Sequence, residues 1–244
     1  MDKIFWQSIT MKYTKAMKLF WDKQTTVNRS RSTVDSGQWT VDRLWTIIYG
    51  LLTVVLVSSC THKAKQLPIF GERKWNGKDT VYHTIAPFQF VDQDSLPITN
   101  ATFQGKIYVA DFFFTSCRTI CPIMKTQMLR VYEATQTTPD ILLLSHSIDP
   151  EYDTVALLHD FAQRLGVESK RWHFVTGVKD SIFKIAQTSY FVSAMEDNSE
   201  PDRRIHSGAF LLIDKQGRIR GKYDGTKEES VNQLLVDIKR LRNE

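Results

Sequence analysis

Cysteine, glycine and proline are all scarce in this sequence of 244 residues, which contains 3 Cys, 11 Gly and 7 Pro. Three cysteines are too few for a disulfide scaffold. The low glycine and proline content excludes a collagenous or low-complexity chain, and a hydrophobic content of 42% argues against disorder in bulk. The length leaves room for one globular domain and an additional segment.

An excess of basic residues is confined to the amino-terminal part of the chain. Residues 1–43 carry eight Lys or Arg and four Asp, which accounts for +4 of the formal net charge of +5. From Cys60 onward there are 24 basic and 23 acidic residues. A nearly neutral domain lacks the positive surface that a phosphate backbone requires, so we expect no nucleic-acid partner.

Residues 44–57 (LWTIIYGLLTVVLV) form an uncharged apolar run of signal-peptide length. A membrane-spanning helix needs about 18 or more apolar residues, so a stable transmembrane anchor is the weaker interpretation. The letters LVSSC at 56–60 resemble a bacterial lipoprotein box, in which the cysteine, here Cys60, is lipidated. The alternative is an uncleaved anchor in which Cys60 is incidental. Both predict a protein of the bacterial cell envelope, anchored to the membrane with its domain on the periplasmic side.

The sequence divides into a leader at 1–60 with its hydrophobic segment at 44–59, a polar linker at 61–80 and a folded domain at 81–244. Strand-like and helix-like segments alternate in the domain, which predicts an α/β fold with a mostly parallel sheet. The apolar run at 107–114 predicts a strand that is buried on both faces. A helix follows, with Pro122 in its first turn.

The remaining pattern predicts a strand at 141–148, a helix from Asp153 as N-cap to Gly166, a strand at 172–175 and a helix at 180–189. Segments 209–213 and 218–223 predict a hairpin with Gly217 in the left-handed region, and an amphipathic helix follows. A central strand that leads into a cysteine-bearing helix, with a hairpin and a helix at the end, is the order of a thioredoxin-like fold.

Two cysteines, Cys117 and Cys121, lie four residues apart where the strand ends and the helix begins. If this turn is helical, both sulfurs lie on one face. Backbone N–H groups and the dipole at a helix start favour thiolate, so the pair can bind a soft metal or close to a disulfide. Inert buried cysteines and a purely structural disulfide are the alternatives. The interpretation as a structural disulfide is the weaker one, because a disulfide that closes so short a loop restrains the unfolded chain little.

The domain resembles the Sco/SenC family of copper-binding, thioredoxin-like proteins that help to assemble the copper centre of cytochrome c oxidase. Four motifs carry the resemblance in the same order: FTxCxxxCP at 114–122, SIDPxxDT at 147–154, WxFxTG at 172–177, and HS followed by a hydrophobic strand and IDxxG at 206–217. The resemblance implies a copper site made by Cys117, Cys121 and His206, with a cytochrome c oxidase copper-centre subunit or a similar cuproprotein as the partner.

The chain departs from the family pattern at Arg118 and Thr119, where members often have proline or an acidic residue and then aspartate. Ile205 stands where an aspartate commonly precedes the histidine. None of these departures removes a ligand. Thiolate sulfur selects Cu(I) and imidazole suits either oxidation state of copper, which is consistent with the implied site.

Several other side chains near the expected site have open roles. From the residues alone, His146 near the end of its strand is as good a ligand candidate as His206, and the resemblance favours His206. Asp111 is either a buried carboxylate beneath the thiols or a partly exposed strand residue. Met124 and Met128 offer thioether sulfur, although at helical spacing such methionines are more often core residues.

Two functions use the same pair of sulfurs. The first is a metallochaperone that binds copper and delivers it to an oxidase subunit, which requires no enzymatic turnover. The second is a membrane-tethered thiol:disulfide oxidoreductase in which Cys117 and Cys121 form a redox-active disulfide. His206 discriminates between them, because copper needs it and disulfide exchange does not. A peroxiredoxin-like peroxidase is disfavoured because the PxxxTxxC motif of that family does not fit the sequence around Cys117.

Overall fold

The computed structural model describes residues 66–244 except 193, 197–203 and 207, and it describes the backbone alone for 194–196 and 204–206. These residues belong to one compact unit, Ala64–Glu244. The strands and helices are, in chain order, β1 (Arg73–Trp75), β2 (Thr80–Tyr82), β3 (Gln89–Asp92), β4 (Pro97–Thr99), the 3-10 helix η1 (Asn100–Phe103), β5 (Ile107–Phe113), α3 (Cys121–Ala134), β6 (Ile141–Ser147), α4 (Val155–Leu165), β7 (Trp172–Thr176), α5 (Lys179–Thr188), β8 (Ala194–Glu196), β9 (Arg204–His206), β10 (Ala209–Ile213), β11 (Ile219–Asp224) and α6 (Glu228–Arg242).

A seven-stranded sheet in the order β11-β10-β5-β6-β7-β3-β4 forms the centre of the domain. Its middle strands β5, β6 and β7 are parallel, and the outer strands are added antiparallel. Every residue of the three middle strands is buried, which is why they appear in the sequence as mostly apolar segments. We call the end of the sheet at which β5 begins the entry pole, and the end at which β5 stops the cysteine pole.

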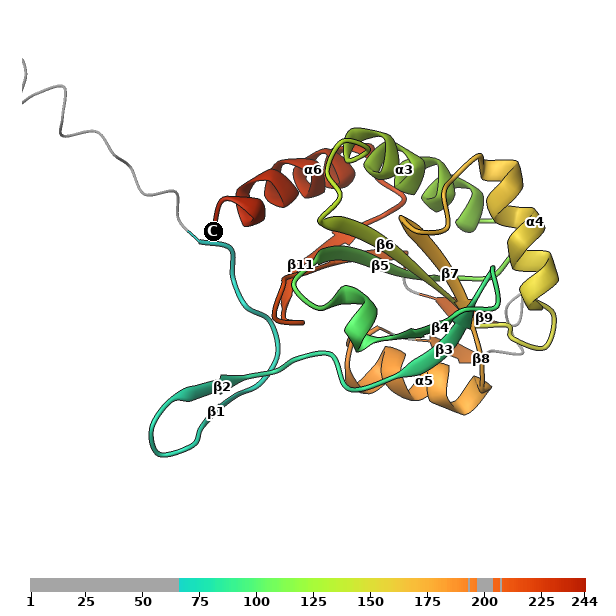
Figure 1. Cartoon of the computed structure of the whole chain (residues 1–244). Coiled ribbons are helices and arrows are strands. Elements are labelled where there is room, and N and C mark those ends of the chain that lie inside the picture. Colours follow the sequence, from blue (N-terminus) through green and yellow to red (C-terminus); the bar gives the residue numbers. More distant parts are fainter. Residues whose placement is uncertain (1–65, 193, 197–203, 207) are drawn as a thin grey trace, which may run out of the picture. The chain divides into compact units, whose positions relative to one another are not determined.

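Helices cover both faces of this sheet (Figure 1). Helices α3, α4 and α6 lie on one face, and α5 with η1 lies on the other. Alternate residues of β5 serve the two layers: Phe113 packs on Phe161 of α4, whereas Phe112 packs on Tyr190, which follows α5. Within the described part of the chain, no helix is both long and apolar enough to cross a bilayer.

The expected elements of the α/β domain are present with small shifts at their ends. Gly217 has φ +76° in the hairpin turn between β10 and β11, and Gly166 ends α4 with φ +68°. The expectation of a polar linker over 61–80 does not hold for its second half. Residues 73–75 form a strand that pairs with β2, and the compact unit begins at Ala64.

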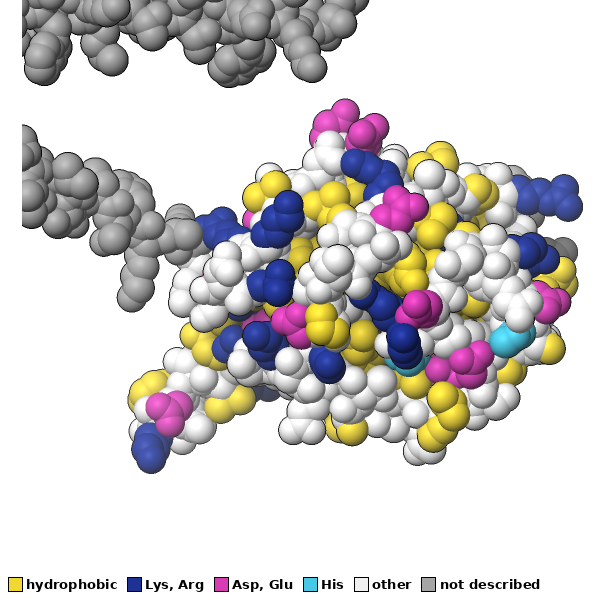
Figure 2. Space-filling model, turned by 45° about the horizontal axis from the view of Figure 1, so that its top comes forward, with side chains coloured by type: hydrophobic (Ala, Val, Ile, Leu, Met, Phe, Trp, Pro, Cys, Tyr) yellow, Lys and Arg dark blue, Asp and Glu magenta, His cyan; other side chains and the backbone are white. Residues whose placement is uncertain are grey.

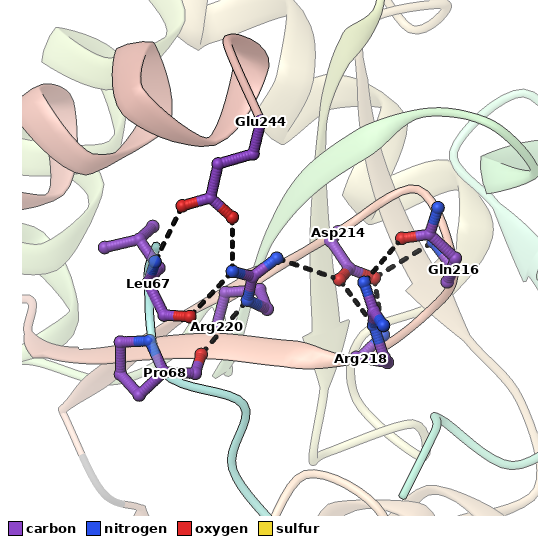
Figure 3. Close-up of polar contacts among 7 residues, drawn as sticks. All are labelled: Leu67, Pro68, Asp214, Gln216, Arg218, Arg220 and Glu244. Carbon is purple, nitrogen blue, oxygen red and sulfur yellow. Dashed lines mark hydrogen bonds and ion pairs between the residues drawn. The ribbon is translucent and has the colours of Figure 1, made fainter. Parts of the chain in front are cut away.

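A buried arginine holds the first described residues against the body of the domain (Figure 3). The guanidinium of Arg220, on β11, donates to the carbonyl oxygens of Leu67 (2.7 Å) and Pro68 (3.0 Å). It also forms ion pairs with Asp214 (3.3 Å) and Glu244, while the Leu67 N–H donates to the Glu244 carboxylate (2.6 Å). We call this set of five residues the Arg220 clasp. It joins the chain entering the domain to β11 and to the end of α6, at the entry pole.

Replacing Arg220 by alanine should release the entering segment. The change leaves the carbonyl oxygens of Leu67 and Pro68 without their side-chain donor and removes one ion-pair partner from Asp214 and from Glu244, and buried partners left unpaired are costly. We expect amide hydrogen exchange at Leu67 to accelerate by more than about tenfold, while exchange in β5 changes less. Arg242→Ala is the matched control, because its ion pair with Asp140 is long (3.8 Å) and solvent-exposed. Unchanged protection at Leu67 in Arg220→Ala would contradict the role of the clasp.

Candidate metal and redox site

The two cysteines lie together at the cysteine pole. Cys117 is in the loop that follows β5, and its N–H donates to the carbonyl of Phe114 (3.3 Å). Cys121 is the first residue of α3, and Pro122 lies in the first turn of that helix, as expected. Both residues are buried and present as thiols rather than as a disulfide. The side chain and the backbone N–H of Cys121 are hydrogen-bonded to the Cys117 sulfur, so the two sulfurs are neighbours.

The two thiols differ in acidity. Burial raises the pKa of Cys117, but hydrogen bonds from the Thr119 hydroxyl (3.5 Å) and from Cys121 outweigh it, so its pKa lies below the ordinary value. Burial raises the pKa of Cys121 well above the ordinary value, and the charge of Lys125 offsets only a small part of this. Cys117 is therefore the sulfur that ionises first, and Cys121 donates to it.

A buried ion pair lies under the start of the cysteine helix. Lys125, one helical turn after Cys121, extends its ammonium group to Asp111 of β5 (2.7 Å) and to the hydroxyl of Ser145 on β6 (3.0 Å). The ammonium also lies 4.0 Å from the centroid of the Phe113 ring. Asp111 is thus fully buried, and the alternative of a partly exposed strand residue is wrong.

Lys125 is the residue of this region that sequence reasoning missed. A lysine four residues after Cys121 shares the face of α3 that carries Met124 and Met128, both of which are fully buried in the core. A lysine on such a face needs a buried counter-ion, since a lone charge is rarely tolerated there. That spacing, together with the isolated Asp111 in an apolar strand, was the available signal.

The expected N-cap role of Asp153 is wrong. Thr154 caps α4, with its hydroxyl accepting from the Leu157 N–H (3.3 Å). The carboxylate of Asp153 instead accepts from the N–H and the hydroxyl of Thr115 and from the hydroxyl of Ser147. Asp153 therefore ties the loop that carries Cys117 to the end of β6, so the SIDPxxDT motif supports the cysteine loop.

His206 is the last residue of β9, which pairs with β8, and His206 is opposite Ala194. Its side chain lies outside the described residues, as does Cys60. The backbone just beyond it is informative. A Cβ placed on Gly208 would be 3.6 Å from the side chain of Ile120, the residue before Cys121, and Ile120, Gly208 and Ala209 line one cavity of about 390 Å³.

The register of β10 also indicates that the chain after His206 is near the cysteine turn. Because Leu211 is opposite Ala110 and β10 runs antiparallel to β5, β10 begins at the cysteine pole. The chain therefore passes the cysteine turn two residues after His206. Among the residues whose side chains are described, no three His, Cys, Asp or Glu side chains converge as a metal site.

His146, the rival of His206, is enclosed on the opposite face of the sheet. Its ring stacks on Phe112 (centroids 4.8 Å apart) and meets Phe88, Phe90 and Tyr190 at steep angles. It is fully buried, and neither ring nitrogen has a hydrogen-bond partner among the described residues. Asp111 and Lys125 lie on the other face, so this aromatic enclosure separates His146 from the network under the cysteines.

The comparisons with known proteins agree with this geometry. The SCO1/SenC family model matches residues 76–243. The crystal structure of a SCO1/SenC family lipoprotein from Bacillus anthracis superposes with a TM-score of 0.61 at 30% identity, covering 66% of this chain and 95% of that chain. A structure of BsSco, a member of the Sco family of cytochrome c oxidase assembly proteins in which a disulfide switch is described, has a TM-score of 0.59 at 28% identity, covering 72% and 96%.

The fold is also that of ScoI from Bradyrhizobium japonicum, which was solved with copper bound and has a TM-score of 0.54 at 24% identity, covering 65% of this chain and 99% of that chain. A thioredoxin-like domain with two cysteines at the start of the helix after its central strand defines the class of protein. This chain belongs to the SCO1/SenC family.

Lys125→Met should lower the free energy of unfolding by about 3–5 kcal/mol, because it leaves the buried Asp111 carboxylate without its counter-ion. The double variant Lys125→Met/Asp111→Asn should recover much of this loss, since no buried charge then remains unpaired. Urea denaturation at neutral pH measures both. Lys74→Met is the control, because Lys74 belongs to an exposed pair and its loss should cost about 1 kcal/mol or less. A loss of similar size in Lys74→Met and Lys125→Met would contradict the buried ion pair.

The pH dependence of the free energy of unfolding should contain a contribution from protonation of His146. Burial lowers the pKa of His146 from 6.5 to about 3. The unfolded chain therefore takes up the proton first, and stability falls as the pH drops from 6.5 towards 3, by up to about 1.4 kcal/mol per pH unit. His146→Leu should remove this component and be at least as stable at pH 7, because it removes two buried ring nitrogens that have no hydrogen-bond partner among the described residues.

Denaturation measured from pH 7 to pH 4 gives the free energy of unfolding of each variant. His159→Leu is the control, because the side chain of His159 is 45% exposed. The same dependence on pH in His146→Leu and in the parent protein would show that His146 is not buried as described.

Proposed function

We propose that this chain is a membrane-tethered, copper-binding metallochaperone that assists assembly of the copper centre of cytochrome c oxidase. Cys117, Cys121 and His206 hold the copper. The observation that carries the proposal is the pair of neighbouring sulfurs at the start of α3 in a member of the SCO1/SenC family. The copper bound to the related ScoI and the cytochrome c oxidase assembly role named for BsSco support it.

The donor set suits copper. Two thiolate sulfurs select Cu(I), an imidazole is compatible with either oxidation state, and three ligands leave a position through which a client ligand can take the ion. The cysteine turn supplies the sulfurs at the surface end of the sheet, where Arg118, Thr119 and Pro122 are exposed. The chain binds and releases the ion, and no bond-making turnover is required.

The assignment of His206 as the third ligand depends more on tertiary structure than that of the two cysteines. Gly208 and Ile120 line one cavity, and β10 starts at the cysteine pole, so the backbone two residues after His206 is near the cysteine turn. This path of the backbone supports His206 as the third ligand. These contacts support His206 over His146, whose ring is enclosed on the other face of the sheet.

The tether and the location belong to the same proposal. Lipidation of Cys60 anchors the domain on the periplasmic side of the membrane of a bacterial cell. The lipoprotein from Bacillus anthracis in the same family supports this assignment. The domain then meets its partner, the copper-centre subunit, at the membrane surface.

A thiol:disulfide oxidoreductase is the second candidate, and the unequal acidity of the two thiols favours it. The Cys117 thiolate attacks a client disulfide and forms a mixed disulfide, releasing one client thiolate. Cys121 then displaces the second client sulfur, so that the client gains two electrons and a Cys117–Cys121 disulfide remains. The disulfide switch described for BsSco supports this chemistry.

Copper titration of residues 64–244 under anaerobic, reducing conditions tests the main proposal. We expect about one copper per chain and, after oxidation, a thiolate-to-Cu(II) absorption that is lost in Cys117→Ser, Cys121→Ser and His206→Ala. His159→Ala is the matched control, since His159 is exposed on α4 and pairs with Asp94. Unchanged copper binding in Cys117→Ser would refute the site.

The same variants separate the two candidates in cells. If His206→Ala, Cys117→Ser and Cys121→Ser each abolish oxidase assembly, copper binding is the function. If His206→Ala leaves assembly intact while Cys117→Ser and Cys121→Ser abolish it, the oxidoreductase is correct, because disulfide exchange does not need the imidazole.

A further inference from the structure

A small two-stranded hairpin projects from the entry pole. Strands β1 and β2 pair only with each other, in a register that sets Trp75 opposite Thr80 (Figure 1). Trp75 is 67% exposed, and Val81 and Phe70 are also exposed. An isolated two-stranded ribbon is marginal in water, and an exposed tryptophan at its end is an unusual feature of a surface in contact with water alone.

Basic side chains flank these apolar ones. Figure 2 shows the projection, at the lower left, with hydrophobic side chains beside Lys or Arg and acidic ones. Residues 61–80 contain five basic residues and two acidic ones, a net charge of +3, whereas the domain as a whole is nearly neutral. Arg73, Lys74 and Lys78 belong to the hairpin together with both acidic residues, Glu72 and Asp79, whereas Lys63 and Lys65 precede the described residues.

The hairpin is held firmly at its base. The ring of Tyr82 lies 5.6 Å from the Arg73 guanidinium and 5.8 Å from that of Arg218 on the body. The Phe70 N–H donates to Ile219 of β11 (2.9 Å), next to the Arg220 clasp. Gly71 has φ +97°, and a Cβ there would lie 2.6 Å from His83, so the chain can make this turn only with glycine.

The tip is also ordered. The side-chain oxygen of Asn76 accepts from the N–H groups of Lys78 (2.9 Å) and Asp79 (2.7 Å), and Gly77 takes φ +93°. The hairpin is therefore a preformed projection, and it carries an exposed tryptophan, Trp75, and two exposed lysines, Lys74 and Lys78.

We infer that the β1–β2 hairpin is a membrane-contact element that binds the anionic headgroup surface of the bilayer to which the chain is tethered. Tryptophan partitions to the membrane interface, and lysines near it are attracted to anionic lipids. The charge of this segment is complementary to such a surface, and the segment begins next to the proposed lipid attachment at Cys60. This inference rests on the membrane tether of the proposed function.

The consequence is a defined orientation of the metal site. The hairpin and the Arg220 clasp are at the entry pole, and the cysteines are beyond the other end of β5. A strand of seven residues separates them, which is roughly 20 Å at about 3.3 Å per residue. With the hairpin on the membrane, Cys117 and Cys121 face away from the bilayer, towards a client domain that projects from it.

Binding of residues 64–244 to lipid vesicles tests the inference, because this compact unit contains the hydrophobic core that the described residues form and lacks Cys60. Its two tryptophans are Trp75 and the fully buried Trp172, so changes in fluorescence on binding report Trp75. We expect binding to vesicles of phosphatidylglycerol and phosphatidylcholine in equal parts, with a blue shift and protection of Trp75 from acrylamide. Pure phosphatidylcholine vesicles should bind more weakly, and added salt should weaken binding.

Two double variants provide a matched comparison. Trp75→Ser/Lys74→Gln removes an exposed apolar residue and an exposed lysine from the hairpin, and its partition coefficient should fall at least about fivefold, the effect expected for one lysine. Val178→Ser/Lys227→Gln removes the same kinds of side chain, exposed by 70% in both cases, from the cysteine pole. It should bind like the parent protein.

Three outcomes would overturn the inference: no binding of the parent fragment to anionic vesicles, an equal loss of binding in the two double variants, or Trp75 remaining open to acrylamide in the bound state. The first would leave a protein partner as the occupant of the hairpin. Copper titration of the same fragment is independent of vesicle binding, so a failure of the copper site and a failure of the membrane contact are distinguished.

Discussion

The buried contact of Lys125 with Asp111 and Ser145 is the interaction on which the site depends. It joins α3 to the two central strands directly beneath the turn that carries both cysteines. A charge on either side of this contact is tolerated only because the other is present, so the helix cannot move relative to β5 without exposing an unpaired ion to an apolar interior. The position of Cys121 relative to Cys117 follows from this constraint.

A second set of contacts fixes the loop around Cys117. Asp153 accepts from Thr115 in that loop and from Ser147 at the end of β6, so the loop is bound to a parallel neighbour of β5. On the other side, Gly208 and Ile120 line the same cavity, so the segment after β9 is near the cysteine turn. Three segments far apart in the chain therefore meet near the two cysteines.

The two ends of the sheet have different tasks. At the entry pole, the Arg220 clasp and the hairpin hold the chain that arrives from the proposed tether. At the cysteine pole, the side chains of the turn are available to a partner. The parallel strands between the two poles fix the distance and the direction from the entry pole to the cysteine turn.

The central strands, the main helices and the position of the cysteine turn could be predicted from local patterns, because apolar periodicity, Pro122 and the glycines at 166 and 217 act within a few residues. The family followed from the resemblance that the four motifs carry. The role of Asp153 and the folded state of residues 66–80 could not be predicted in this way. Each depends on side chains that meet across more than ten positions of sequence or across elements, as when Arg220 binds Leu67 and Glu244. Such contacts leave no periodic signal in the chain and are decided only when the sheet and its helices pack together.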